Sequence, residues 1–328
     1  MKIVFMGTPD FAQKSLEAIY NAGCEIVAVV TNPDKPKGRG MKMISSPVKQ
    51  YADSKGLKIY QPLKIRNNED FINDMRKLCP DLFCVVAYGK ILPKELLEIP
   101  RYGAINVHGS LLPKYRGAAP IQWSVINGDK ETGVTTMFMD EGMDTGDMIL
   151  KEKVIIGDDE TTGELWEELS KLGAKLLVKT INMIENVSEK IEKKDEEKQR
   201  IKELVGAENQ KGEFSTAPMI NKEMAKIDWK KTSKEIHNLI RGLNPVMGAY
   251  SLYNDKKIKI WKTKIIDNIE IKDNYLSGEI FKVSKDELIV KTGDGLLSIL
   301  EIQPENKKKM AIKDYLNGSQ IKEGDIFK

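Results

Sequence analysis

Short apolar runs alternate with amphipathic stretches through the first half of the chain. Between the first two runs, Phe11–Ala22 carries apolar residues at helical spacing and is followed by Gly23, which predicts a helix that ends there. Strands alternating with helices are typical of a doubly wound sheet, so we expect a Rossmann-like α/β domain with a parallel sheet. The five predicted strands are Lys2–Met6, Glu25–Val30, Leu82–Ala87, Ala104–Val107 and Val134–Met139.

The second half begins with an amphipathic stretch, Thr162–Ile184, whose leucines fall on one face and predict a core-facing helix. Residues 186–210 are dominated by lysine and glutamate, which indicates a charged linker that supports at most an exposed helix. Beyond it, a predicted helix at Thr232–Arg241 precedes five short alternating runs separated by Asn, Asp and Gly turns. These runs, at Gly248–Tyr253, Lys257–Ile266, Gly278–Val283, Glu287–Thr292 and Leu296–Gln303, predict a small β-barrel of the oligonucleotide-binding (OB) type.

The length of 328 residues suits two domains, each with its own core. We therefore expect a Rossmann-like domain over residues 1–185, a linker over 186–210 and an OB-like domain over 211–328. The hydrophobic fraction of 41% and the charged fraction of 31% are those of a water-soluble globular protein.

Targeting signals and metal motifs are not expected. Neither an apolar run of roughly 18 residues nor a signal peptide is visible, and residues 1–7 are typical of a strand followed by a turn. The three cysteines form no CxxC pair, so we expect neither disulfides nor a zinc site. These features favour the cytoplasm.

Charge is unevenly divided along the chain, whose net charge is +3. From Asn209 onward there are 22 lysines and arginines against 17 aspartates and glutamates. The surplus permits a polyanionic partner there, and an ordinary lysine-rich surface explains it equally well.

Polar residues at the predicted end of one strand could carry chemistry. No GxGxxG or GxxxxGK[ST] loop is present, which disfavours a dinucleotide-binding protein and a nucleotide hydrolase. Asn106 and His108 are two apart on an extended segment, so they project to the same face and can converge on one substrate atom. The alternative is that His108 is a structural residue whose hydrogen bonds are satisfied within the fold.

An acidic loop follows the last predicted strand of the first half. It carries Asp140, Glu141, Asp144 and Asp147 among two glycines, and its spacing does not match an EF-hand, so we expect no metal. One carboxylate near His108 would favour the charged imidazolium, a donor suited to a developing oxyanion. The residue pattern leaves open which of the four acids takes that place.

Several longer motifs resemble the folate-dependent formyltransferases. Residues 106–123 read NVHGSLLPKYRGAAPIQW and residues 142–147 read GMDTGD, a combination too long to arise by chance. The likeness extends to GTPDFA at 7–12, NPDKPKGRG at 32–40, AKIDW at 225–229 and IRGLNP at 240–245, so it spans nearly the whole chain.

The resemblance implies an activity and a set of site residues. Asn106, His108 and Asp144 match the family's catalytic trio, and a segment matching the one that lines the folate site comprises Ser110, Leu111, Leu112 and Pro113. The implied reaction moves the formyl group of 10-formyltetrahydrofolate to the α-amine of methionyl initiator tRNA, without a metal or a covalent enzyme intermediate. In it, Asn106 and His108 donate to the oxyanion, while Asp144 orients the histidine and accepts the proton of the amine directly or through water.

The implied RNA contacts lie in a basic loop between Asp34 and Lys49, with glycines at 38 and 40 that suggest mobility. In the resembling family this insertion approaches the acceptor end of the tRNA, which points here to Lys35, Lys37, Arg39 and Lys42. A solvated basic loop is the alternative. The C-terminal barrel would track the RNA backbone with a lysine cluster near Tyr253 and Trp261, made of Lys256, Lys257, Lys259, Lys262 and Lys264.

Other members of the same superfamily are the main alternatives. A glycinamide ribonucleotide formyltransferase usually stops after the first domain, an amino-sugar formyltransferase lacks the basic insertion, and a formyl-folate dehydrogenase carries a further domain. A non-catalytic RNA-binding protein of the same fold is disfavoured by the intact trio. We expect a monomer, and we expect His237 to be a packing or surface histidine.

Overall fold

The computed structural model describes residues 1–37, 42–191, 197–267 and 275–328. Contacts divide the chain into two compact units that do not follow the chain order. The first unit comprises Met1–Pro120, Gly133–Val154 and Trp166–Ala217, and the second comprises Ile121–Thr132, Ile155–Leu165 and Pro218–Lys328. The domain boundaries expected at residues 185 and 210 stay a prediction, and residues 197–217 contact the first unit.

The first unit is built on a seven-stranded sheet in the order β5-β2-β1-β6-β7-β8-β9. From β5 to β7 neighbouring strands are parallel, and the order reverses between β1 and β6. That reversal defines a doubly wound sheet, so the expected α/β fold class is confirmed. The strands are β1 (Lys2–Gly7), β2 (Glu25–Val30), β5 (Ile59–Tyr60), β6 (Leu82–Val86), β7 (Ala104–His108), β8 (Glu131–Phe138) and β9 (Met148–Ile155).

The expectation of a parallel sheet does not hold at β8. This strand is antiparallel to β7, with Thr135 opposite His108 and Phe138 opposite Ile105. After β7 the chain passes through residues 121–132 of the second unit and returns to the sheet at the edge where β7 ended, so it runs back along β7.

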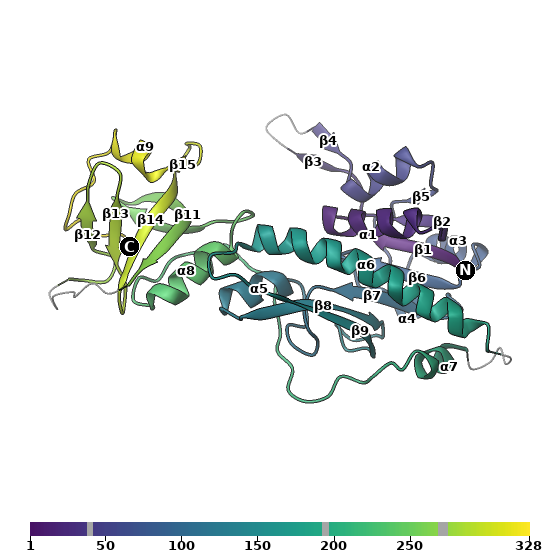
Figure 1. Cartoon of the computed structure of the whole chain (residues 1–328). Helices are drawn as coiled ribbons and strands as arrows, with labels where there is room; N and C mark the ends of the chain where they lie inside the picture. The colour runs from purple at the N-terminus through teal and green to yellow at the C-terminus, as the bar shows by residue number, and fades with distance from the viewer. Residues whose placement is uncertain (38–41, 192–196, 268–274) are drawn as a thin grey trace. The chain divides into compact units, whose positions relative to one another are not determined.

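Helices cover both faces of this sheet (Figure 1). On one face lie α1 (Asp10–Asn21) and α6 (Thr162–Ser188), joined where Phe11 and Trp166 meet edge to face at 5.1 Å. A Cβ on Gly173 of α6 would lie 3.0 Å from Val107 of β7, so this glycine permits close packing of helix on sheet. The other face packs α3 (Glu69–Lys77) and α4 (Lys94–Leu97) through Phe71, Met75 and Leu96.

Three further elements complete the first unit. The helix α2 (Pro47–Ser54) begins at Ser46, whose side chain accepts a bond from Lys49 N, and α7 (Glu197–Leu204) falls in the stretch expected to be a linker. The strands β3 (Lys35–Lys37) and β4 (Lys42–Ile44) pair as a hairpin, so the expected basic loop contains regular structure at these residues.

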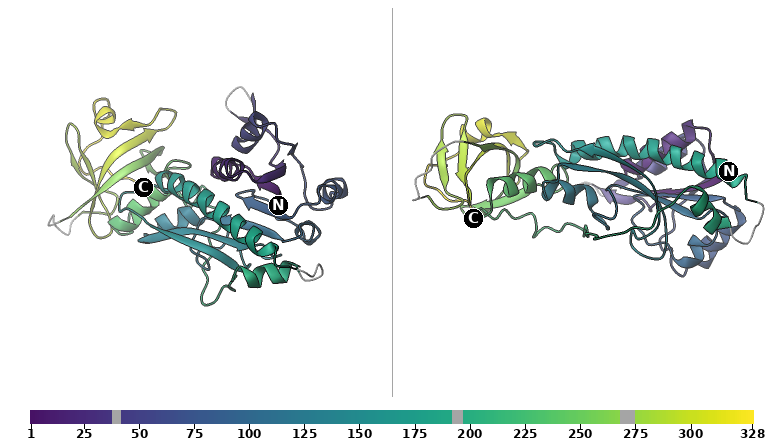
Figure 2. Two further views of the ribbon diagram at one scale, coloured as in Figure 1. Left: turned by 45° about the vertical axis from the view of Figure 1, so that its right-hand side comes forward. Right: turned by 60° about the horizontal axis from the view of Figure 1, so that its bottom comes forward.

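The second unit contains a curved antiparallel sheet in the order β10-β11-β14-β13-β12, with β15 paired to β14 (Figure 2). All five predicted strands are present: β10 (Ala249–Tyr253), β11 (Lys256–Ile266), β12 (Ile280–Val283), β13 (Leu288–Lys291) and β14 (Leu296–Pro304), and β15 (Met310–Ala311) is a short addition. The helices are α5 (Pro120–Ile126), α8 (Ser233–Gly242) and α9 (Ile312–Leu316). A capping box between Thr232 and Glu235 starts α8, whose Ile236 and Ile240 enter a core containing Trp229.

Candidate active site

Asn106 and His108 lie on β7, the strand at which the parallel part of the sheet ends. Both residues face the same side because they are two apart on a strand, as the sequence predicts. His108 is the last residue of β7 and is 5% exposed, and Asn106 is half-buried. The carboxyl ends of the parallel strands are where doubly wound sheets bind their ligands.

Asp144 approaches these two residues from the loop after β8. Its Oδ2 lies 3.6 Å from His108 Nδ1, and its Oδ1 accepts a 3.4 Å hydrogen bond from Asn106 Nδ2. The loop can fold back because residue 146 is glycine, where any Cβ would overlap the carbonyl oxygen of Phe138. The side chains of Asn106, His108 and Asp144 therefore converge.

The carboxylate of Asp144 is also held by the backbone. Gly117 N donates to Asp144 Oδ2 at 2.8 Å. Gly117 has a φ of 126°, and a Cβ there would lie 2.8 Å from Ala217 O. A glycine is required both for this backbone conformation and for the close approach.

The hydrogen bonds of His108 fix which ring nitrogen carries a proton. His108 Nε2 lies 2.9 Å from the carbonyl oxygen of Tyr115, which can only accept. The Nε2–H tautomer is therefore required, and Nδ1 is the nitrogen that faces Asp144. A proton can then be gained or lost at Nδ1 without breaking the bond to Tyr115.

The segment predicted to line a folate site follows His108 directly. Ser110 and Leu112 are almost fully buried, and Leu111 and Pro113 are half-buried. Thr135 Oγ1 donates to Ser110 O at 2.7 Å and accepts from Leu112 N at 3.2 Å. The Ser110 side chain donates to Lys114 O at 2.6 Å, and the Leu112 side chain packs in a buried cluster with Met137 and Met148. Leu111 and Pro113 are therefore better placed for contact with a ligand.

The predicted RNA contacts fall on the β3–β4 hairpin. Lys35 is exposed on β3, Lys37 ends β3 and Lys42 begins β4, while Arg39 lies outside the described residues. Lys49, a further basic residue of this segment, instead forms an ion pair with Asp34, with Nζ 2.8 Å from Oδ2.

Asp34 anchors the base of this hairpin. Hydrogen bonds from Lys49 and then from Gln61 hold the pKa of Asp34 below its usual range. Lys49 is therefore a structural partner of Asp34 in this segment.

The aromatic residues expected beside the C-terminal lysines take part in packing. Trp261 is 8% exposed and donates to Gln303 Oε1 at 3.1 Å, and the Tyr253 hydroxyl donates to Asp325 at 2.7 Å. Lys257 stacks on the Tyr250 ring at 3.4 Å from its centroid. These rings are partly or wholly covered, so they serve the packing of this unit.

Sequence reasoning missed two residues that hold the backbone around the catalytic trio. Gln210, the last residue of the predicted linker, bonds to the backbone of Asp144. Ser215, just beyond the linker, bonds to the backbone of Tyr115. Their bonds go to backbone atoms far away in sequence, which no local motif reveals. The change from a Lys/Glu-rich composition to Gly212-Glu213-Phe214-Ser215 was the only available signal.

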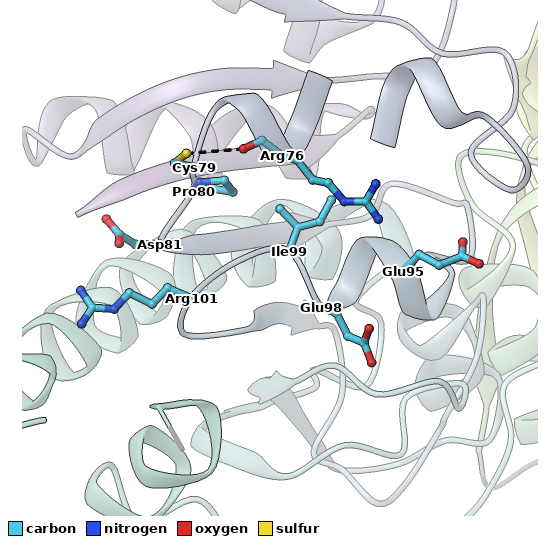
Figure 3. A pocket seen from close by; sticks show the side chains of 8 residues that line it. All are labelled: Arg76, Cys79, Pro80, Asp81, Glu95, Glu98, Ile99 and Arg101. Carbon is cyan, nitrogen blue, oxygen red and sulfur yellow. Dashed lines mark hydrogen bonds between the residues drawn. The ribbon is translucent and has the colours of Figure 1, made fainter. Parts of the chain in front are cut away.

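A separate pocket of about 600 Å³ lies at the opposite edge of the sheet (Figure 3). Pro80 and Asp81 line it, and they directly precede β6, so the pocket is at the amino end of that strand. Doubly wound sheets bind ligands at the other edge. Within the described residues, no cluster of metal-ligating side chains is found and no helix is long and apolar enough to cross a membrane.

Comparison with known families matches both halves of the chain. Residues 1–181 match the family described as formyl transferase, and residues 219–320 match the formyl transferase C-terminal domain. Residues 182–218, which include Gln210 and Ser215, fall between the two matches.

The chain is also similar to individual proteins along its entire length. It is 50% identical over 328 residues to a methionyl-tRNA formyltransferase of Caldanaerobacter subterraneus subsp. tengcongensis, with 100% of both chains covered. A methionyl-tRNA formyltransferase of Clostridioides difficile is 50% identical over 327 residues, again with 100% of both covered. Among solved structures, the sugar 3N-formyl transferase WlaRD shares the fold, with a TM-score of 0.65, 23% identity, and 94% and 99% of the two chains covered.

Proposed function

Because the chain belongs to the formyl transferase family, we propose that it transfers the formyl group of 10-formyltetrahydrofolate to the α-amine of methionyl initiator tRNA. The product is formylmethionyl-tRNA, which serves bacterial translation initiation. The observation that carries the proposal is the 50% identity to methionyl-tRNA formyltransferases over the full chain, together with the convergence of Asn106, His108 and Asp144.

In the proposed reaction the neutral amine attacks the formyl carbon and an oxyanion develops on the formyl oxygen. Asn106 Nδ2 and the protonated Nδ1 of His108 donate to this oxyanion, a role in which one donor is typically worth on the order of 10²–10³ in rate. Asp144 stabilises the imidazolium and accepts the proton that the amine loses, directly or through water. The oxyanion then collapses, the C–N bond to the folate breaks, and the folate nitrogen takes up the proton that Asp144 accepted.

The geometry supports these separate roles. The bond from Nε2 to Tyr115 O leaves Nδ1 as the nitrogen that donates to the oxyanion, 3.6 Å from Asp144 Oδ2. The bond from Gly117 N orients that carboxylate. Folate would lie along the segment after β7, against Leu111 and Pro113.

The RNA partner would be held electrostatically by the basic residues Lys35, Lys37, Arg39 and Lys42. Arginine forms forked bonds to phosphate and stacks on bases, so Arg39 is assigned the acceptor end of the tRNA. The lysines of β11 supply a second contact, along the RNA backbone. We further propose that the enzyme acts as a monomer in the cytoplasm.

One assay tests this function. Purified protein is supplied with methionyl initiator tRNA and 10-formyltetrahydrofolate, and the aminoacyl ester is analysed for formylmethionine by mass spectrometry. Formylated product is the expected result. Folate hydrolysis without formylmethionine would contradict the proposal and favour a hydrolase, and formylation of an amino sugar but not of the tRNA would favour a small-amine acceptor.

A further inference from the structure

The segment from Lys202 to Ala217 is hydrogen-bonded to the loop that carries Asp144. Glu208 pairs with Met148 through two backbone bonds, of 2.8 and 2.9 Å. Lys202 Nζ donates to Asp147 Oδ2 at 3.0 Å, and Asn209 also donates to Asp147. All of these contacts lie within the first unit.

Gln210 uses every hydrogen-bonding group of its side chain in this segment. Its Nε2 donates to the carbonyl oxygens of Asp144 and Gly146, at 2.8 and 3.0 Å. Its Oε1 accepts from Arg116 Nε at 2.9 Å, which fixes the orientation of the amide. An amide supplies two donors and one acceptor in this geometry, and a carboxylate of the same shape supplies no donor.

The bond to Asp144 acts on a residue in a strained conformation. Asp144 has a φ of 55°, in the left-handed region that non-glycine residues seldom occupy. Such conformations persist only where the surroundings hold them. Because Gln210 binds the carbonyl group of this same residue, it helps set the direction in which the Asp144 carboxylate points toward His108.

The same segment also reaches the backbone partner of His108. Tyr115 N donates to Ser215 Oγ at 2.9 Å, and Arg116 N donates to Ser215 O at 2.8 Å. Tyr115 has a φ of 62°, and its carbonyl oxygen accepts the bond from His108 Nε2. Both the histidine and the carboxylate of the trio are thus supported by residues 210–215.

We propose that Gln210 is a positioning residue for formyl transfer, which holds the Asp144 loop in its reactive geometry, and that Ser215 supports His108 through Tyr115. The proposal rests on the proposed function. Residues 210–215 lie outside both family matches, and the simpler interpretation is that they only tether two domains. The proposal instead gives them a role in positioning the catalytic residues.

The test is Gln210→Glu, which keeps the shape and the acceptor for Arg116 but removes both donors. We expect kcat to fall about 10- to 100-fold, as for misplacement of a reacting group by about 1 Å, while the KM values for both substrates change less than about 2-fold. The matched control is Gln199→Glu, the same change at an exposed site on α7, where kcat should be retained. If Gln210→Glu fails to fold, Gln210→Met removes the same donors without adding charge.

A double-variant cycle separates positioning from general loosening of the structure. If Gln210 acts through Asp144, then adding Gln210→Glu to Asp144→Asn should lower kcat by less than about 3-fold further, because residues that act as one unit are not additive. A fully additive loss, or an unchanged kcat for Gln210→Glu alone, would overturn the proposal. An inactive wild-type protein would instead contradict the proposed function.

Discussion

Asp144 Oδ2 and His108 Nδ1 face each other at 3.6 Å, although His108 ends the parallel strand β7 and Asp144 lies in the loop between β8 and β9. The pairing depends on a backbone that folds back after β8 and on a left-handed conformation at Asp144. The carboxylate of Asp144 thus faces the ring nitrogen that the proposed reaction uses as a donor. Its loss therefore has a predictable consequence for the reaction.

Asp144→Asn should lower kcat by about 10²–10⁴-fold, because the amide can neither accept the proton of the amine nor stabilise the imidazolium. The amide keeps the shape, so the melting temperature should change little. Steady-state formylation of methionyl-tRNA measures the effect. Glu141→Gln is the control, since Glu141 belongs to the same loop but is exposed and pairs only at 3.5 Å with Lys94. Equal activities of the two variants would remove Asp144 from the mechanism.

Gly117→Ala should impair both folding and activity. The φ of 126° would cost about 1–3 kcal/mol for a residue with a side chain. In addition, the new Cβ would approach Ala217 O at 2.8 Å and displace the N–H that binds Asp144.

Gly56→Ala is the matched control for Gly117→Ala. Gly56, just after α2, also has a positive φ, of 64°, but nothing lies within 4 Å of its Cβ position. Comparing kcat and thermal melting of the two variants isolates the clash from the backbone strain. A kcat loss of the same size in both would show that the contact with Asp144 is unimportant.

Local periodicity predicted the elements that carry Asn106 and His108 because a strand fixes the direction of its side chains. Alternation along residues 104–108 suffices to put both on one face, and the register with β6 follows from burial. The same reasoning located α6, α8 and the five main strands of the second unit. These are the features whose stabilising contacts are encoded by residues close in sequence.

Long-range backbone contacts explain what the sequence could not predict. By composition the four acids in the loop of residues 140–147 are equivalent: the family resemblance named Asp144, and the structure adds the fold-back at Gly146 that brings it to His108. The direction of β8 depends on the excursion of the chain into the second unit. The bonds of Gln210 join backbone carbonyls far away in sequence, so the stretch before it resembled a plain charged linker.

Lys35→Ala should weaken tRNA binding and reduce its salt dependence. Each neutralised phosphate contributes about 0.7–0.9 to the slope of log K against log salt concentration, so one lost contact should lower the slope by roughly that amount. Fluorescence anisotropy with labelled tRNA at several salt concentrations gives the slope. Lys190→Ala, at an exposed lysine just after α6, should leave the slope unchanged. Binding that is insensitive to salt would contradict the assigned polyanionic partner.

The buried histidine of the second unit, His237, should make stability depend on pH. The expectation of a packing role for this residue fits its position, because its side chain is 7% exposed and its Nδ1 lies 3.0 Å from Thr263 Oγ1. Burial lowers the pKa of His237, and this outweighs the bond to Asp158 O and the attraction of Asp159, which act in the opposite direction.

The sign follows from proton binding in the two states. Between the lowered pKa of the folded state and the unfolded value of about 6.5, the unfolded chain binds more protons at His237, so the free energy of unfolding rises with pH. Urea unfolding at a series of pH values from about 5 to 7 should show this rise. His237→Gln, which keeps a hydrogen-bonding group toward Thr263, should remove that part of the slope. If the wild type and His237→Gln respond equally to pH, the histidine is not kept neutral by its burial.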